Sequence, residues 1–185
     1  MWKFPLNMNV VGVTWNSMSF SQIDIEKNIE IPVGNHCGAF GIERKYDVHK
    51  GVDLYCPENT EVYAVEDGII VQKRPFTGSK VGSPWWNDTD AISIEGESGI
   101  VVYGEIEIDT KFQEGDVVKS GEKIGRVKAV LKEDKGRPMS MLHIALHHHG
   151  VLSNGNWEIG KPQPIGLLDP TNKLISTIDD LKRRK

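Results

Sequence analysis

The chain has 185 residues, of which 38% are hydrophobic and 26% are charged, a balance that fits one folded domain and excludes a disordered chain. Its net charge of -4 excludes the clustered positive charge of a nucleic-acid-binding protein, and the one basic run, residues 182–185, is interpreted as a solvated tail. There is no run of about 18 apolar residues, so no transmembrane helix is expected.

The N-terminal residues contain no basic segment followed by an apolar stretch, so no secretory signal is expected. This favours a cytoplasmic protein, or one that is exported by a non-standard, phage-type route. Cys37 and Cys56 are too few for a disulfide framework and are predicted to be separate thiols.

Turn residues recur at short intervals with β-rich runs between them, which predicts an all-β domain. Asp67-Gly68 predicts a hairpin turn between the β-rich runs that precede and follow it. Further β structure is predicted in residues 91–94, 100–106, 115–127 and 139–147, with the first two runs joined as a second hairpin.

Residues 75–89 contain several glycines and prolines and predict a long loop, a kind of segment that is often functional in compact domains. The adjacent Trp85 and Trp86 in this loop have two interpretations: they stack on a substrate, or they pin the loop to the core. The large apolar area of the two rings favours pinning.

The one clear helix is predicted near the C-terminal end. Asp169 can cap it, and Pro170 fits its first position. Its apolar stripe consists of Leu174, Ile175, Ile178 and Leu181. The helix is expected to lie on the outside of the sheet.

Residues 48–54 carry the first candidates for a metal site. In a strand, His49, Gly51 and Asp53 would share one face. A straight strand would separate His49 from Asp53 by about 13 Å, too far for one ion. Both can bind the same ion only if the chain bends, and Gly51 is where it can bend.

Strand alternation assigns the two faces of residues 141–147. The core face consists of Leu142, Ile144 and Leu146, and the opposite face of Met141, His143, Ala145 and His147. His148 and His149 follow at the end of the strand and are expected to be exposed. Zinc binds imidazole and carboxylate ligands, and catalytic sites keep one position open for water. A site of two histidines and one aspartate would therefore suit a zinc ion that activates water.

These segments resemble the LytM and lysostaphin type of zinc endopeptidase, also called the glycyl-glycine endopeptidase family. The matching segments, in one order along the chain, are residues 40–44, 49–53, 60–68, 103–106, 115–125, 141–144 and 166–171. The resemblance covers roughly residues 33–176. It implies a two-layer antiparallel β sandwich or half-barrel, the duplicated hybrid motif, with a short C-terminal helix. The expected domain spans residues 33–185, with residues 1–32 packed on it as an N-terminal extension.

The resemblance implies an enzyme that hydrolyses peptide cross-links of the bacterial cell wall, so the expected partner is peptide or peptidoglycan. The chain is expected to be a monomer. By position, the implied zinc ligands are His49, Asp53 and His143. The candidate substrate-binding residues are His36, Trp85, Trp86 and Tyr103.

The sequence departs from the family at three positions. The family usually has histidines where this chain has Glu105 and Met141, and those histidines are thought to handle the water and the oxyanion. It usually has a glutamate, which orients the third ligand, where this chain has Ala145. Met141 cannot donate a hydrogen bond, so His147 and His36 are the candidates for stabilising the oxyanion.

Glu105 itself has two interpretations. A glutamate beside zinc-bound water is a suitable general base, so Glu105 can replace the missing histidine. Otherwise it is a charged residue at a strand end that faces solvent.

Two functions therefore remain open. The chain is a zinc peptidase, or it is a zinc-stabilised module of the same fold that binds peptide or muropeptide, or a partner protein, without cutting it. A lipoyl-type carrier is disfavoured because Asp67-Gly68 presents no lysine at a hairpin tip.

Overall fold

The computed structural model describes residues 1–15, 25, 27–134, 138–153 and 155–183. The strands are β1 (Asn9–Thr14), β2 (Asn28–Pro32), β3 (Val52–Tyr55), β4 (Glu61–Tyr63), β5 (Gly68–Thr77), β6 (Thr89–Gly96), β7 (Gly99–Ile108), β8 (Val117–Val118), β9 (Lys123–Val127), β10 (Met141–His147) and β11 (Leu167–Leu168). A short 3-10 turn spans Ser79–Val81, and the helix α1 spans Thr171–Arg183.

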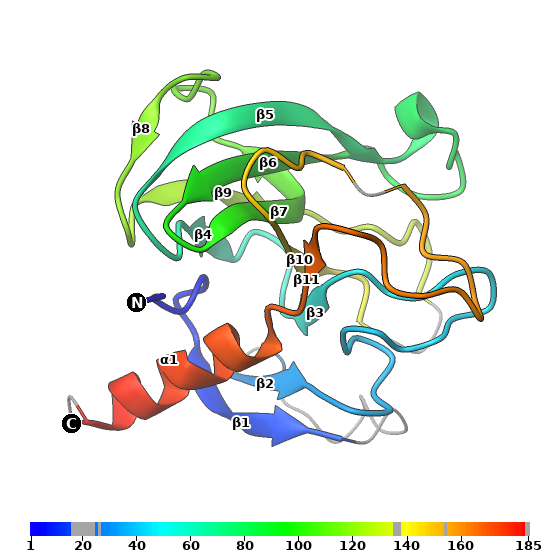
Figure 1. Cartoon of the computed structure of the whole chain (residues 1–185), viewed down its shortest axis with the longest axis horizontal. Helices are drawn as coiled ribbons and strands as arrows, with labels where there is room; N and C mark the ends of the chain where they lie inside the picture. Colours follow the sequence, from blue (N-terminus) through cyan, green and yellow to red (C-terminus); the bar gives the residue numbers. More distant parts are fainter. Residues whose placement is uncertain (16–24, 26, 135–137, 154, 184–185) are drawn as a thin grey trace.

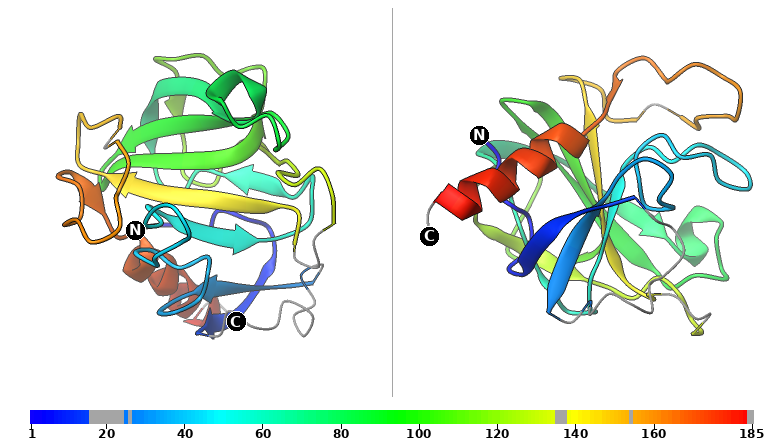
Figure 2. Two further views of the ribbon diagram at one scale, coloured as in Figure 1. Left: turned by 90° about the vertical axis from the view of Figure 1, so that its right-hand side faces the viewer. Right: turned by 90° about the horizontal axis from the view of Figure 1, so that it is seen from below.

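Nine of these strands form one antiparallel sheet, which confirms the predicted all-β class. Its main order is β11-β10-β7-β6-β5-β8, with β3 paired to β10 and β9 paired to both β4 and β7. The strands β1 and β2 form a separate parallel pair. In Figure 1 the large curved sheet lies above this pair and α1 lies beside the pair; the views in Figure 2 agree.

One hydrophobic core joins the sheet to the elements below it. Leu142, Ile144 and Leu146 of β10 are each at most 1% exposed and belong to this core, as alternation predicted. Residues of β1, β2 and α1, together with Trp2 and Leu6, pack into the same cluster. The opposite face of β10 is left for the residues that form the site.

The predicted hairpin at Asp67-Gly68 is wrong, although β5 does begin there. The strand β4 pairs with β9, and β5 pairs with β6 and β8. Neither Asp67 nor Gly68 has the positive φ that a type I′ turn requires. The Asp67 carboxylate instead accepts hydrogen bonds from the Ser120 backbone N–H at 2.7 Å and from Lys119 Nζ at 3.0 Å. The second predicted hairpin, β6–β7, is confirmed.

The long loop is shorter than expected because β5 continues to Thr77 and β6 begins at Thr89. Pro75 lies within β5 next to a register shift, where its missing N–H is tolerated. Pinning by the tryptophans is also wrong: Trp85 is 64% exposed and Trp86 is 37% exposed. Asn87 fastens the loop instead, since its backbone N–H donates to the Val130 carbonyl and its amide donates to two nearby carbonyls.

The predicted helix and the Asp169 cap are confirmed, although α1 begins at Thr171, one residue after Pro170. The Asp169 carboxylate accepts the Thr171 backbone N–H at 2.8 Å. Leu174 and Ile178 are buried in the core and Ile175 is half-buried, whereas the side chain of Leu181 lies outside the described residues. No helix in the described part of the chain is both long and apolar enough to cross a membrane.

Candidate metal centre

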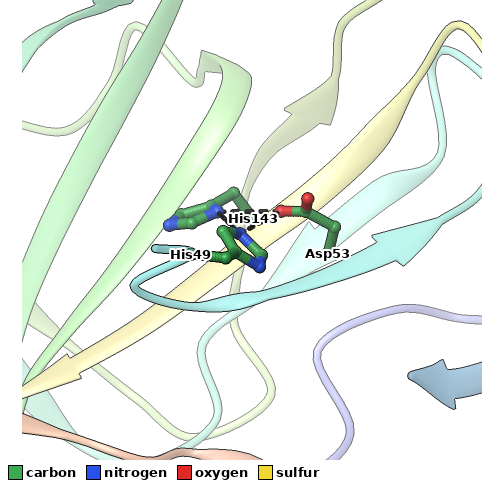
Figure 3. A group of neighbouring side chains, drawn as sticks. All are labelled: His49, Asp53 and His143. Atoms are coloured by element: carbon green, nitrogen blue, oxygen red, sulfur yellow. Dashed lines mark hydrogen bonds and ion pairs between the residues drawn. The ribbon is translucent and has the colours of Figure 1, made fainter. Parts of the chain in front are cut away.

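The three predicted ligands meet on the face of the sheet opposite the core. Asp53 of β3 and His143 of β10 are direct cross-strand partners, so their side chains are neighbours. His49 precedes β3 and is brought to them by a bend at Gly51, as predicted. Figure 3 shows the three side chains converging from these two segments.

The spacing of the ligand atoms fits a tetrahedral zinc ion. Asp53 Oδ1 lies 2.9 Å from His143 Nδ1 and 3.1 Å from His49 Nε2, and the two nitrogens are 3.3 Å apart. Ligands held at 2.0–2.1 Å from a tetrahedral ion are separated by roughly 3.3 Å. Two imidazoles and one carboxylate are donors that zinc prefers, and they leave a fourth position for water. The cluster can therefore hold a metal ion.

Neighbouring groups hold the ligands in the protonation states that a metal needs. His49 Nδ1–H donates to the Ala39 carbonyl at 2.9 Å, which leaves Nε2 with its lone pair. Burial lowers the pKa of His143 and so favours the neutral ring, although Asp53 opposes this. Burial alone would raise the pKa of Asp53, but the adjacent His49 and His143 hold it well below its ordinary value.

Gly51 has a second function that the sequence did not reveal. A Cβ atom at this position would lie 2.5 Å from the Ile144 carbonyl oxygen and 2.7 Å from His143 Nε2. The glycine therefore gives room for the ligand ring as well as for the bend.

Replacing Gly51 with alanine should displace His143 and weaken zinc binding by about 10-fold or more, the usual effect of disturbing the support of a ligand. A zinc titration against a competing chelator measures this, with a thermal melt of the metal-free protein as the control for folding. An unchanged zinc affinity would show that the His143 ring can bind zinc without the space that Gly51 leaves.

Glu105 lies beside the metal centre because β7 changes partner there. Its first half pairs with β10, where Gly104 lies opposite His143, and its second half pairs with β9. At the change, two residues of β7, Gly104 and Glu105, lie opposite one residue of β6, which is a β-bulge. Glu105 has a left-handed backbone with φ 65°, unusual for a residue that is not glycine. The bulge turns Glu105 off the core face, while Tyr103 and Ile106 remain on it.

The Glu105 carboxyl faces the cleft rather than solvent. Its Oε2 is buried and has no hydrogen-bond partner among the described residues. Burial raises the pKa of Glu105 well above its ordinary value; nearby Asp53 raises it further, and Arg44 opposes the shift. A buried carboxyl with a raised pKa beside candidate metal ligands has the properties of a general base.

A cleft of about 540 Å³ contains the three ligands and Glu105. Of the other sequence candidates, His147 and Trp86 line this cleft, whereas His36, Trp85 and Tyr103 do not. Tyr103 is 1% exposed, and its hydroxyl accepts the Val65 backbone N–H at 2.9 Å inside the core. His36 is 2% exposed, and its Nδ1 accepts the Gly38 N–H at 3.0 Å.

The two remaining histidines and the two cysteines lie outside the cleft. His148 and His149 are exposed, as expected. Cys37 and Cys56 are free thiols, and burial raises the pKa of Cys56 to about 12, so that thiol is unreactive.

Several residues of the cleft were not identified from the sequence. Arg44 forms an ion pair with Asp53 Oδ2, the oxygen on the other side of the carboxylate from the histidines. The ring centre of Phe76 lies 5.3 Å from the ring centre of His143, and Phe76 packs against the small apolar cluster that contains Ala145. Gln72 and Arg74 also line the cleft. The sequence pattern that could have identified Gln72, Arg74 and Phe76 is their alternation along β5, because every second residue of a strand lies on the same face.

Comparison with known proteins identifies the wider relationship. The model of peptidase family M23 matches residues 47–155, which include all three candidate ligands. No curated protein sequence matches the chain.

Three solved structures share the fold. Lysostaphin from Staphylococcus simulans, an antimicrobial peptidase, matches with 22% identity and a TM-score of 0.55 over 81% of this chain and 51% of its own. A LytM protein from Ruminococcus gnavus matches with 17% identity and a TM-score of 0.56 over 97% of this chain and 61% of its own. A chain of the SpoIIQ–SpoIIIAH pore-forming complex matches with 17% identity and a TM-score of 0.53 over 100% and 97%. This chain thus spans about half the length of lysostaphin.

Proposed function

The chain belongs to peptidase family M23, and on that premise we propose that it is a zinc metallopeptidase that hydrolyses peptide bonds of bacterial cell-wall cross-links. The observation that carries this proposal is one cleft that contains both the His49–Asp53–His143 cluster and the buried carboxyl of Glu105. The first group supplies a metal site and the second supplies a base. A hydrolase needs both.

When bound by His49, Asp53 and His143, zinc would polarise the scissile carbonyl and make water more acidic. Glu105 accepts the proton of the attacking water at its buried Oε2 and then delivers it to the leaving nitrogen as the C–N bond breaks. Arg44 favours the ionised form of Glu105, which a base requires, and a bound cation would favour the same form.

Arg44 is the group that we propose for stabilising the oxyanion. Met141 cannot donate a hydrogen bond, and His147 lies four residues along β10 from His143, about 13 Å in an extended strand. Arg44 lines the cleft, pairs with Asp53 and interacts with Glu105. Its guanidinium supplies cationic donors to the cleft beside Asp53 and Glu105.

The alternative function is a module of the same fold that binds peptide or muropeptide without cutting it. The replacement of both expected catalytic histidines, by Glu105 and Met141, favours this function. Such a binding module would hold the peptide in the same cleft but would need no general base.

Incubating the zinc-loaded protein with purified peptidoglycan and with a glycine-rich peptide separates the two functions. A peptidase should release new amino termini, measured by labelling of primary amines, and a chelator should stop the release. If the peptide binds but no amino termini appear, the chain is a binding module.

A further inference from the structure

The cleft also contains an arginine, Arg74, whose distance from the metal ligands is limited by two ring contacts. The Arg74 guanidinium carbon lies 5.2 Å from the centre of the Phe76 ring. That ring centre lies 5.3 Å from the centre of the His143 ring. The distance from the guanidinium to the centre of the His143 ring therefore cannot exceed the sum of these two distances. About three residues of extended peptide are enough to span it.

Arg74 differs from the other arginine of the cleft in lacking an acidic partner. Arg44 pairs with Asp53, and the pKa of Arg44 is raised despite its burial. Arg74 makes no ion pair with any described residue, and burial lowers its pKa with no carboxylate acting against this. Its one described hydrogen bond is a long one, 3.4 Å, to the Pro75 carbonyl. A half-buried guanidinium without an acidic partner is a suitable site for an anionic ligand.

Two further positively charged or protonatable groups, Lys50 and His147, line the same cleft as Arg74. The Lys50 ammonium donates to the Gly155 carbonyl, and Asp47 is the acidic residue that faces it. His147 Nδ1–H donates to the Val151 carbonyl at 3.0 Å, so Nε2 is the atom left for a ligand.

Gln72 adds a hydrogen-bond acceptor to a cleft in which Arg74 and Lys50 are donors. It lies two residues before Arg74 on the same face of β5 and lines the same cleft. Its amide oxygen Oε1 is buried and has no hydrogen-bond partner in the described part of the chain. A buried acceptor without a donor is unfavourable unless a ligand supplies an N–H group.

We propose that Arg74, with Lys50 and His147, forms a subsite that binds a carboxylate of the peptide substrate, at most about three residues from the hydrolysed bond. The Gln72 amide oxygen accepts a backbone N–H of the same peptide. This inference rests on the proposed function and adds to it a substrate class: peptides with a free carboxylate near the cleavage site.

The test compares the binding of two peptides that differ only in one charge, N-acetyl-tetraglycine and its C-terminal amide, to the zinc-loaded full chain. Calorimetry should show that the carboxylate form binds at least about 10-fold more tightly, as a charge-assisted hydrogen bond predicts. In Arg74→Gln this ratio should fall to near one while the affinity for the amide stays the same. The matched control is Arg126→Gln, an exposed arginine outside the cleft, which should keep the ratio.

A third peptide, amidated at its C-terminus and carrying one glutamate, distinguishes a side-chain carboxylate from a terminal one. Equal affinity for all peptides, or no binding at millimolar concentration, would overturn the subsite. A preference that survives in Arg74→Gln would also overturn it, because the carboxylate would then be bound by the metal. None of these readouts needs turnover, so failure of the cleavage assay and failure of the subsite are distinguishable.

Discussion

His143→Ala should lower bound zinc from about one ion per chain to almost none, because a three-residue site that loses one ligand no longer satisfies a tetrahedral ion. The two ligands that remain, His49 and Asp53, lie close in sequence and present only two donor atoms. Metal analysis of the purified, dialysed protein by mass spectrometry measures the ratio. The fold should persist, since Asp53 keeps its contacts with His49 and Arg44.

His149→Ala is the matched control, since His149 is an exposed histidine only six residues away. It should retain the zinc content of the unaltered chain. Stoichiometric zinc in a folded His143→Ala protein would refute the ligand set, whereas loss of zinc in His149→Ala would point to metal held by the run of three histidines. Circular dichroism of the metal-free variants verifies that both are folded.

Glu105→Gln should reduce kcat about 10²- to 10⁴-fold and leave the zinc content unchanged, because it removes a general base but none of the proposed ligands. Glutamine has nearly the shape of glutamate, so the bulge in β7 and its left-handed residue should be preserved. The rate of release of amino termini from the substrate that the unaltered protein cleaves is the measurement.

Glu107→Gln makes the same chemical change two residues along β7, at an exposed position outside the cleft. It should cleave at the normal rate. Normal cleavage by Glu105→Gln would exclude Glu105 as the base, and a loss of zinc in that variant would mean that the carboxyl supports the metal site instead.

Local sequence pattern was sufficient for much of the fold, whereas the resemblance to the LytM and lysostaphin type implied which residues are the metal ligands. The alternation in residues 141–147 correctly assigned Leu142, Ile144 and Leu146 to the core, because the two faces of a strand differ in burial. The bend at Gly51 followed from the reach of an extended chain. The cap at Asp169 and the apolar stripe of α1 are also local features, set within a few residues of one another.

Other features depended on which strands pair. The Asp67-Gly68 pattern predicted a hairpin, but the partners of β4 and β5 come from elsewhere in the chain, and tertiary pairing prevailed over a local turn preference. In the same way, Trp85 and Trp86 have the area to pin a loop, yet Asn87 fastens it through carbonyls more than 40 residues away.

The sequence by itself determined the all-β class, because alternation is a property of short segments, and its resemblance to the LytM and lysostaphin type implied the three residues that can hold a metal. Only the tertiary structure decided what surrounds them. Glu105 reaches the cleft through a bulge of β7 against β6, at the point where β7 changes partner from β10 to β9. Arg74 lies near the ligands because it contacts the Phe76 ring, which in turn contacts the His143 ring. These placements depend on contacts between distant strands, and no local periodicity records such contacts.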